Sequence, residues 1–225
     1  MRKIQLLICL LGMIQMVMAQ KMDNGERKYT EHYYERMEQF WAEAPISRKD
    51  IVMLGNSLTE NGGDWAARTK KKNVRNRGII GDEVMGVYDR LHTILPGEPK
   101  KIFLLIGVND ISHDLTADSI VAMIDQTVLR IRKESPKTKL YLQSLLPINE
   151  SFNRYKRLKG KTDMVPEINA KLEVLAKKYN VKYINLFPLF VEKGTNVLRR
   201  ELSTDGLHLK EAGYDIWVKA IKRKL

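Results

Sequence analysis

The feature that most constrains this chain is a regular alternation of short apolar runs with longer stretches of helical spacing. The predicted strands are residues 50–54, 73–77, 101–106, 139–145 and 181–187. The predicted helices are residues 29–43, 83–93, 117–133, 165–179 and 210–222. Strands were assigned from run length and composition, and helices from apolar residues that recur every three or four positions. Because right-handed crossovers place a helix between consecutive parallel strands, this order predicts an α/β fold with a five-stranded parallel sheet between two helical layers.

The first nineteen residues have the layout of a signal peptide. Arg2 and Lys3 precede an apolar run, and Ala19 ends that run in a position that suits cleavage before Gln20. The uncharged stretch is too short to make a convincing membrane anchor. The sequence therefore predicts a secreted or periplasmic protein with a leader of residues 1–19 and a single domain of residues 20–225. We expect no stable membrane insertion once the leader is removed.

Cysteine usage and charge limit the possible chemistry. The single cysteine, Cys9, lies inside the predicted leader, which argues against a lipoprotein anchor, a disulfide framework, a Cys-type zinc site and a cysteine nucleophile. The formal net charge of +12 would favour anionic partners. The basic residues are scattered, however, apart from one denser run within residues 154–161, and a solvated surface is the simpler explanation. That run contains one aromatic residue, Tyr155, and lacks the repeated aromatic interleaving of single-stranded nucleic-acid binders, so no nucleic-acid partner is expected.

Ser57 occupies the position where a parallel sheet of this kind places its chemistry. Ligands of open α/β sheets bind beyond the carboxyl ends of the strands, and Ser57 follows the first predicted strand directly. Gly55 permits a sharp turn there, and the next helix would begin with unpaired amides. This position suits an exposed nucleophile, and it suits an ordinary helix N-cap equally well. The segment alone does not decide between them.

A serine nucleophile needs a base, and three of the four histidines follow an aspartate by three residues. The three pairs are Asp89/His92, Asp110/His113 and Asp205/His208. In a turn or helix this spacing makes the two side chains neighbours, so the carboxylate can fix the tautomer that leaves Nε2 free to accept a proton. The first pair lies within a predicted helix and, like His32, is expected to be a surface or packing feature. The spacing does not choose between the other two pairs, both of which can reach the carboxyl edge of the sheet.

A tetrahedral intermediate at Ser57 would also require hydrogen-bond donors aimed at its oxyanion. The candidates are the amide of Ser57, a backbone amide in the turn of residues 80–82 and the side-chain amide of Asn109. Each of them, taken alone, is explained equally well as a turn residue.

Four blocks occur in a fixed order along the chain: residues 55–58 (GNSL), 76–82 (NRGIIGD), 107–110 (GVND) and 205–209 (DGLHL). Together they resemble the SGNH, or GDSL-type, esterase family over about residues 51–214. The resemblance implies Ser57 as the nucleophile, with Asp205 and His208 completing a catalytic triad. It also implies an oxyanion hole formed by Ser57, Gly81 and Asn109, and a flavodoxin-like three-layer α/β/α sandwich with no metal or organic cofactor.

The blocks depart from the family pattern at one position, because the usual aspartate before the serine is Asn56 here. That residue is neither nucleophile nor base, so the change affects local hydrogen bonding rather than the proposed chemistry. The candidate pocket residues are Asn56, Trp65, Asp110 and His113. Trp65 and either Phe152 or Tyr155 would form a wall for a sugar or acyl group, and burial of these aromatic rings in the core is the alternative.

The resemblance predicts a serine esterase that hydrolyses a short-chain ester, with an acetyl group on a carbohydrate as the favoured substrate. No long apolar lid segment is apparent, which argues against a lipase acting on water-insoluble fat. A lysophospholipid or another short-chain ester is the first alternative, and a non-catalytic basic binding module on the same fold is the second. The sequence leaves the acyl group, the alcohol, the oligomeric state and any ligand of the run at 154–161 open.

Overall fold

The computed structural model describes residues 29–225 and contains a five-stranded parallel sheet with strand order β2-β1-β3-β4-β5. The strands are β1 (Ile51–Gly55), β2 (Val74–Gly78), β3 (Lys101–Leu105), β4 (Lys139–Gln143) and β5 (Lys182–Ile184). The α-helices are α2 (Glu31–Ala42), α3 (Ser57–Glu60), α4 (Trp65–Thr69), α5 (Val84–Asp89), α6 (Val108–Ser112), α7 (Ala117–Glu134), α8 (Met164–Lys178) and α9 (Glu211–Ile221). The predicted α/β class and the flavodoxin-like strand order are confirmed.

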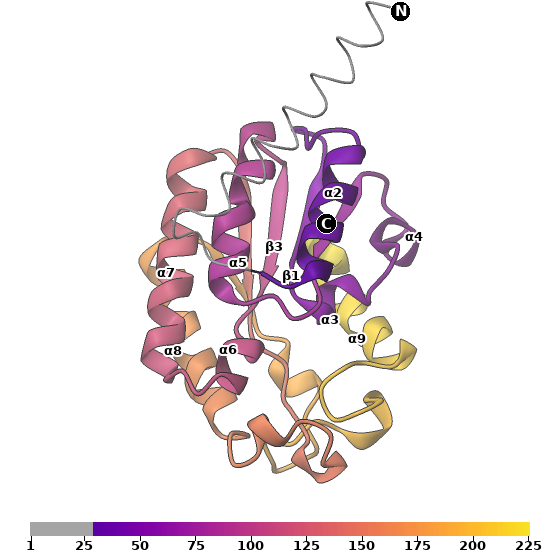
Figure 1. Ribbon diagram of the computed structural model, residues 1–225, viewed down its shortest axis with the longest axis vertical. Helices are drawn as coiled ribbons and strands as arrows, with labels where there is room; N and C mark the ends of the chain where they lie inside the picture. Colours follow the sequence, from indigo (N-terminus) through magenta and orange to yellow (C-terminus); the bar gives the residue numbers. More distant parts are fainter. Residues whose placement is uncertain (1–28) are drawn as a thin grey trace, which may run out of the picture.

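Helices cover both faces of the sheet because both faces are apolar. Alternate residues of the central strands belong to two different cores: Val52 and Leu104 pack with α5, α7 and α8, whereas Met53 and Phe103 pack with α4 and α9. Figure 1 shows these two groups of helices on opposite sides of β1 and β3. Burial on both faces explains why the third strand shows no apolar–polar alternation in the sequence.

The predicted strands at residues 139–145 and 181–187 extend past the observed ones because side chains replace the sheet as hydrogen-bond partners. Strand β4 ends at Gln143, and the hydroxyl of Ser144 accepts the backbone N–H groups of Leu186 and Phe187, both at 2.9 Å. The side chain of Asn169 accepts the amide of Leu145 at 2.7 Å. These bonds satisfy buried amides without a strand ladder, so β5 also ends early, at Ile184.

The chain changes direction across the sheet at the carboxyl end of β1. Strand β1 pairs with β2 on one side and with β3 on the other, so the segments that follow β1 and β3 diverge from a topological switch point. Gly55 ends β1 there, and a Cβ at this position would lie 2.2 Å from the carbonyl oxygen of Leu105. The close contact requires glycine and brings the start of α3 against the end of β3.

The loops that carry the candidate chemistry lie at the same end of the molecule. In Figure 1 the loop between β4 and α8, the segment before α9, and α6 lie together at the lower end of the view. The loop between β4 and α8 contains two short 3₁₀ turns, Glu150–Phe152 and Lys156–Leu158.

The predicted leader of residues 1–19 lies outside the described residues, so the cleavage site and the extent of the mature domain stay predictions. Among residues 29–225, none of the helices combines the length and the apolar character that crossing a membrane requires.

Candidate active site

Ser57 is the first residue of α3 and sits directly beyond the end of β1. Asn56 is the N-cap of this short helix, and its side-chain oxygen accepts the backbone N–H of Leu58 at 3.1 Å. Ser57 is therefore not the capping residue, and its hydroxyl is available for another partner. The serine is only 3% exposed, so it is less open to solvent than its position in the sequence suggested.

The side chains of Ser57, His208 and Asp205 form one continuous hydrogen-bonded row. The Nε2 atom of His208 lies 2.9 Å from the Oγ of Ser57, and its Nδ1 atom lies 2.8 Å from Oδ2 of Asp205. Ser57 and His208 are 151 positions apart in the chain. When Nδ1 carries the proton and donates to the carboxylate, Nε2 is free to accept the serine proton. This arrangement has the geometry of an activated nucleophile.

A tight turn presents Asp205 to the imidazole. Oδ1 of Asp205 accepts the backbone N–H groups of Leu207 at 3.0 Å and His208 at 2.8 Å. Gly206 has a φ of +91°, and a Cβ there would lie 2.2 Å from the carbonyl oxygen of Asn149. Glycine at this position therefore allows the turn to pack against the loop after β4.

The environment of Asp205 favours its ionised form. Partial burial acts to raise the pKa of this carboxyl, but the hydrogen bonds from His208, Leu207 and Tyr155 outweigh burial and hold the pKa below its ordinary value. A carboxylate that stays ionised can orient the imidazole and stabilise the imidazolium that forms when His208 takes a proton.

The other three histidines have different partners, although two of them share the Asp-x-x-His spacing. The ring of His92 bonds the backbone oxygen of Asp89 at 2.8 Å, and His32 contacts the carboxylate of Glu60 at 3.0 Å. His113 is half-exposed, and its Nδ1 contacts the carboxylate of Glu83. Of the four histidines, only His208 lies within hydrogen-bonding distance of Ser57 in the structure.

Three donors remain available around the start of α3 and the loop after β2. Within residues 29–225, the backbone N–H groups of Ser57 and Gly81 have no hydrogen-bond acceptor. The side-chain amide of Asn109 donates one hydrogen to the carbonyl of Asp82 at 2.8 Å and keeps its second hydrogen free. Unpaired donors of this kind suit a developing oxyanion.

The loop that carries Gly81 is held on both sides. The N–H of Ile80 donates to the carboxylate of Glu60 at 2.6 Å, and the carbonyl of Asp82 accepts from Asn109. The loop is thus tied to the end of α3 and to α6, the two helices that follow the strands at the switch point. Gly81 itself has a φ of +80°, a conformation that favours glycine.

A buried ion pair between Arg90 and Asp82 holds the loop of Gly81 against the ends of β1 and β2. Both side chains are 0% exposed, and Nε of Arg90 lies 2.9 Å from Oδ2 of Asp82. Arg90 also donates to the carbonyls of Arg77 and Gly55, each at 2.9 Å. Burial raises the pKa of Asp82 to about 6 even though the Arg90 guanidinium opposes the rise. One arginine therefore links the ends of β1 and β2 to the loop of Gly81.

Three of the four candidate pocket residues are buried, which corrects the expectation that they line a substrate pocket. Trp65 is 0% exposed, its Nε1 donates to the carbonyl of Thr59 at 2.8 Å, and its ring packs edge-on against Trp217. Asn56 serves as the cap of α3, and its Nδ2 is buried without a partner among the described residues. Asp110 accepts the N–H of Val84 at 3.2 Å. All three side chains are therefore engaged by backbone groups of the surrounding turns.

Asp110 and His113 do not pair with each other, so the rival Asp-x-x-His pair is not assembled. Burial raises the pKa of Asp110 to about 7, with the Val84 amide acting in the opposite direction. His113 remains at the surface, beside Glu83.

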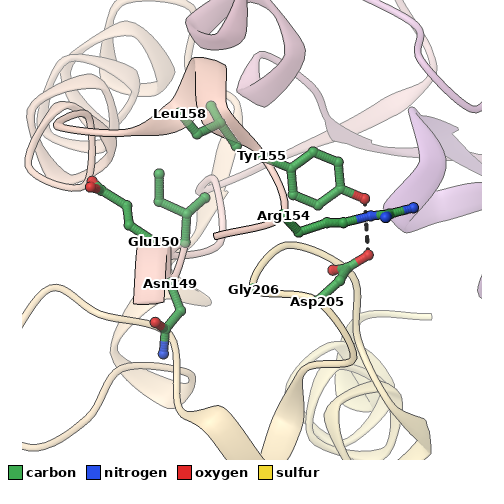
Figure 2. Close-up of a pocket in the computed structure, with 8 residues that line it drawn as sticks. Asn149, Glu150, Arg154, Tyr155, Leu158, Asp205 and Gly206 are labelled. Atoms are coloured by element: carbon green, nitrogen blue, oxygen red, sulfur yellow. Dashed lines mark hydrogen bonds between the residues drawn. The ribbon is translucent and has the colours of Figure 1, made fainter. Parts of the chain in front are cut away.

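A small hollow lies beside Asp205. It contains about 200 Å³ of empty space, part of it open to solvent. Its walls are formed by Ile148, Asn149, Glu150, Arg154, Tyr155, Leu158, Asp205 and Gly206. Figure 2 shows Tyr155 and Asp205 pointing toward one another across it. The sequence suggested Tyr155 only as a wall for substrate, and its contact with Asp205 could not be predicted from it.

Glu60 and Arg90 are further residues that the sequence analysis missed. Arg90 carried a usable signal, because it lies three residues after Val87 and one before Leu91 on the buried stripe of a predicted helix. A charge on such a stripe indicates a buried pair. Glu60 carried no comparable signal.

Within residues 29–225, no three His, Cys, Asp or Glu side chains are grouped closely enough to hold a metal ion.

Comparison with known proteins gives matches over most of the chain. The model of the GDSL-like Lipase/Acylhydrolase family matches residues 53–216. A curated rat (Rattus norvegicus) protein, platelet-activating factor acetylhydrolase IB subunit alpha2, is 27% identical over 173 residues, which are 73% of this chain and 71% of the relative.

Two solved structures share the fold. A GDSL-like lipase from Bacteroides thetaiotaomicron is 24% identical with a TM-score of 0.75, covering 85% of this chain and 96% of the other. A variant of an acetyl-xylooligosaccharide esterase from Geobacillus Stearmophilus is 18% identical with a TM-score of 0.64, covering 80% of this chain and 94% of the other.

Proposed function

The chain belongs to the GDSL-like lipase/acylhydrolase family and is a carboxylic ester hydrolase, and on this basis we propose that it removes short acyl groups, acetyl above all, from carbohydrate esters. The proposed nucleophile is Ser57, the proposed general base is His208, and Asp205 orients the histidine. The observation that carries this assignment is the row of hydrogen bonds from Ser57 Oγ to His208 Nε2 at 2.9 Å and from His208 Nδ1 to Asp205 at 2.8 Å.

The proposed reaction has two halves. In the first, the Oγ of Ser57 bonds to the ester carbonyl carbon while His208 Nε2 takes the serine proton. The amide of Ser57, the amide of Gly81 and the side-chain amide of Asn109 receive the oxyanion. The bond to the alcohol oxygen then breaks, His208 returns the proton to that oxygen, and the acyl group remains on Ser57. In the second half, water takes the place of the alcohol, and hydrolysis releases the acid and free Ser57.

Two observations support acetyl as the acyl group that is removed. The curated relative is named as an acetylhydrolase and the Geobacillus protein as an acetyl-xylooligosaccharide esterase, so the two names share the acetyl group and differ in the alcohol. Within this chain, the nearly buried Ser57 favours a small acyl group over a long one. The second candidate substrate is platelet-activating factor itself, which the name of the curated relative supports. Because the chain is an ester hydrolase, the alternative of a non-catalytic basic binding module is not retained.

The test combines three variants with a graded set of substrates. Ser57→Ala and His208→Ala should each lower kcat on p-nitrophenyl acetate by roughly 10⁴-fold or more, whereas the control His113→Ala should keep near wild-type activity. Retained activity in His208→Ala with loss in His113→Ala would overturn the assignment of the base. Among p-nitrophenyl acetate, butyrate and octanoate, we expect kcat/KM to fall with chain length. Acetylated xylo-oligosaccharides compared with platelet-activating factor then decide the alcohol, and a clear preference for the latter would replace the carbohydrate proposal.

We also propose that the protein is exported with residues 1–19 as its signal peptide, as the charge and apolar pattern of that segment supports. Expression of the full chain in a bacterial host, followed by intact-mass analysis of the periplasmic fraction, should give a product that begins at Gln20. A product retaining Met1 in the cytoplasm would contradict export.

A further inference from the structure

Tyr155 makes contacts that the proposed reaction does not yet explain. It lies between the two 3₁₀ turns of the loop after β4, and it is 36% exposed. Its hydroxyl is 2.9 Å from Oδ2 of Asp205 and 3.1 Å from Nδ1 of His208. The tyrosine ring stands edge-on to the imidazole, with centroids 5.8 Å apart and an interplanar angle of 70°. Figure 2 shows the bond between the hydroxyl and Asp205 along the rim of the hollow.

We propose that Tyr155 is a positioning residue for the ester hydrolysis, and that it acts through Asp205 and His208 rather than by touching the substrate. This inference rests on the proposed function, because it assigns Tyr155 a task only if His208 is the base. Tyr155 thus extends the row Ser57–His208–Asp205 by one further hydrogen bond, supplied from a loop that is distant in sequence from the other three residues.

The hydrogen-bond inventory of Asp205 supports a direct role for the hydroxyl. Oδ1 accepts two backbone N–H groups, those of Leu207 and His208, while Oδ2 accepts Nδ1–H of His208 and the hydroxyl of Tyr155. A carboxylate offers about four acceptor positions, so all of them are used. If Tyr155 were absent, Oδ2 would keep only the imidazole as a partner. More of the carboxylate's negative charge would then act on the imidazole of His208.

The direction of the proton in this bond is fixed by chemistry. Burial, together with the hydrogen bond to Asp205 and its charge, raises the pKa of Tyr155 to about 12. The phenol is therefore neutral over the working range of an esterase and donates to the carboxylate. It cannot also donate to Nδ1 of His208, because that nitrogen must carry its own proton to bond with Asp205.

Few other charged groups face this cluster. From the loop of Tyr155, the guanidinium of Arg154 lies beside the tyrosine hydroxyl. The segment 205–208 contributes Asp205, and α3 contributes Ser57. Glu150 also lines the hollow, but its carboxylate is occupied by the amides of residues 160–162 and by the hydroxyl of Thr162.

The loop holds Tyr155 firmly enough for such a role. The carboxylate of Glu150 closes the loop by bonding Gly160, Lys161 and Thr162. The N–H of Leu158, a buried residue, donates to the carbonyl of Tyr155 at 3.0 Å. The N–H of Asn149 donates to the carbonyl of Gly206 at 2.8 Å and so ties the loop to the turn that presents Asp205. The distance between Tyr155 and Asp205 is therefore set by backbone contacts.

The test is the pH dependence of kcat and kcat/KM for Tyr155→Phe on p-nitrophenyl acetate. Without the hydroxyl, Asp205 and His208 are held less firmly in the reactive orientation, so kcat should fall by roughly three- to tenfold, which corresponds to the net contribution of one ordinary hydrogen bond, and KM should not change. Without the donor the carboxylate stabilises imidazolium more strongly, so the midpoint of the acid limb of kcat/KM should move to higher pH by about half a unit to one unit. The matched control is Tyr183→Phe, which also removes a tyrosine hydrogen bond, to the carbonyl of Asn169 at 3.1 Å, away from the row.

A double-mutant comparison separates positioning from substrate contact. If Tyr155 acts through Asp205, then adding Tyr155→Phe to Asp205→Ala should cause no further loss. An effect that persists in the Asp205→Ala background, or one confined to KM, would mean that Tyr155 contacts the substrate and would overturn the inference. Indistinguishable pH profiles of Tyr155→Phe and Tyr183→Phe would overturn it as well.

Ser57→Ala in the same assay distinguishes failure of the inference about Tyr155 from failure of the proposed function. If Ser57→Ala is inactive and Tyr155→Phe behaves as its control does, the inference about Tyr155 fails and the proposed function stands. If Ser57→Ala retains activity, the proposed function fails, and the role of Tyr155 fails with it.

Discussion

Replacing Arg90 by methionine removes the side chain that joins the strand ends to the loop of Gly81. Methionine has a stem of similar size, so the main effect is electrostatic rather than a cavity. Arg90 and Asp82 are both 0% exposed, and breaking a buried pair of this kind costs about 3–5 kcal/mol because one charge is left without its partner. The carbonyls of Arg77 and Gly55 each lose one donor as well. We therefore expect the free energy of unfolding to fall by about 4 kcal/mol.

The loss should depend on pH in a defined direction. Burial already raises the pKa of Asp82 to about 6, and without the guanidinium this carboxyl will bind its proton more tightly in the folded state. A group whose folded pKa is raised contributes stability that is present at low pH and lost as the pH rises. The deficit of Arg90→Met should therefore be smaller at pH 5 than at pH 8. Adding Asp82→Asn should recover part of it at pH 8.

The assay is denaturant unfolding at both pH values, with Arg48→Met as the control. Arg48 forms an ion pair with Glu98, but its side chain is 73% exposed, so its removal should cost less than about 1 kcal/mol. The reasoning is refuted if Arg90→Met costs no more than Arg48→Met, or if its deficit is equal at pH 5 and pH 8.

Two further predictions concern carboxylates beside the proposed site. Asp110→Asn should stabilise the protein at pH 8 by on the order of 2–4 kcal/mol and leave it nearly unchanged at pH 4, because burial raises the pKa of Asp110 from 3.8 to about 7 and ionisation then costs stability as the pH rises through that window; equal melting temperatures of variant and wild type at pH 8 would count against this. Glu60→Gln weakens the acceptor of the Ile80 amide and should lower kcat several-fold with little change in KM. Glu35→Gln, which changes a side chain that is 59% exposed on α2, should not lower kcat; identical kcat values for the two variants would contradict a role for Glu60.

The sheet could be predicted from the sequence because its cause is local. The central strands β1 and β3 are apolar runs, the longer helices carry an amphipathic stripe, and the crossover rule orders them. The strand ends were less predictable, since Ser144 and Asn169 take over amides that a continuing strand would have paired. Such side-chain partners come from segments that are distant in the chain.

In the candidate site, too, features encoded locally in the sequence were predictable, and features that depend on distant contacts were not. The combination of four blocks predicts Ser57, Asp205 and His208 as a triad, whereas the spacing of Asp and His alone fits three pairs, of which only one lies beside Ser57. Tyr155 could not be placed in advance, because the loop after β4 has no periodicity and its path depends on Glu150 closing it. Trp65 was ambiguous for a related reason: an aromatic ring after a glycine turn fits a pocket wall or a core, and the position of α9 decides for the core.

The central claim is that Ser57 is an activated nucleophile, and covalent labelling tests it most directly. The folded protein is treated with a fluorophosphonate, and the adduct is located by intact-mass measurement and peptide mapping. We predict one adduct per chain, on Ser57, formed rapidly in the wild type and in His113→Ala and much more slowly in His208→Ala. Absence of labelling in folded protein, or an adduct on another serine, would contradict the account.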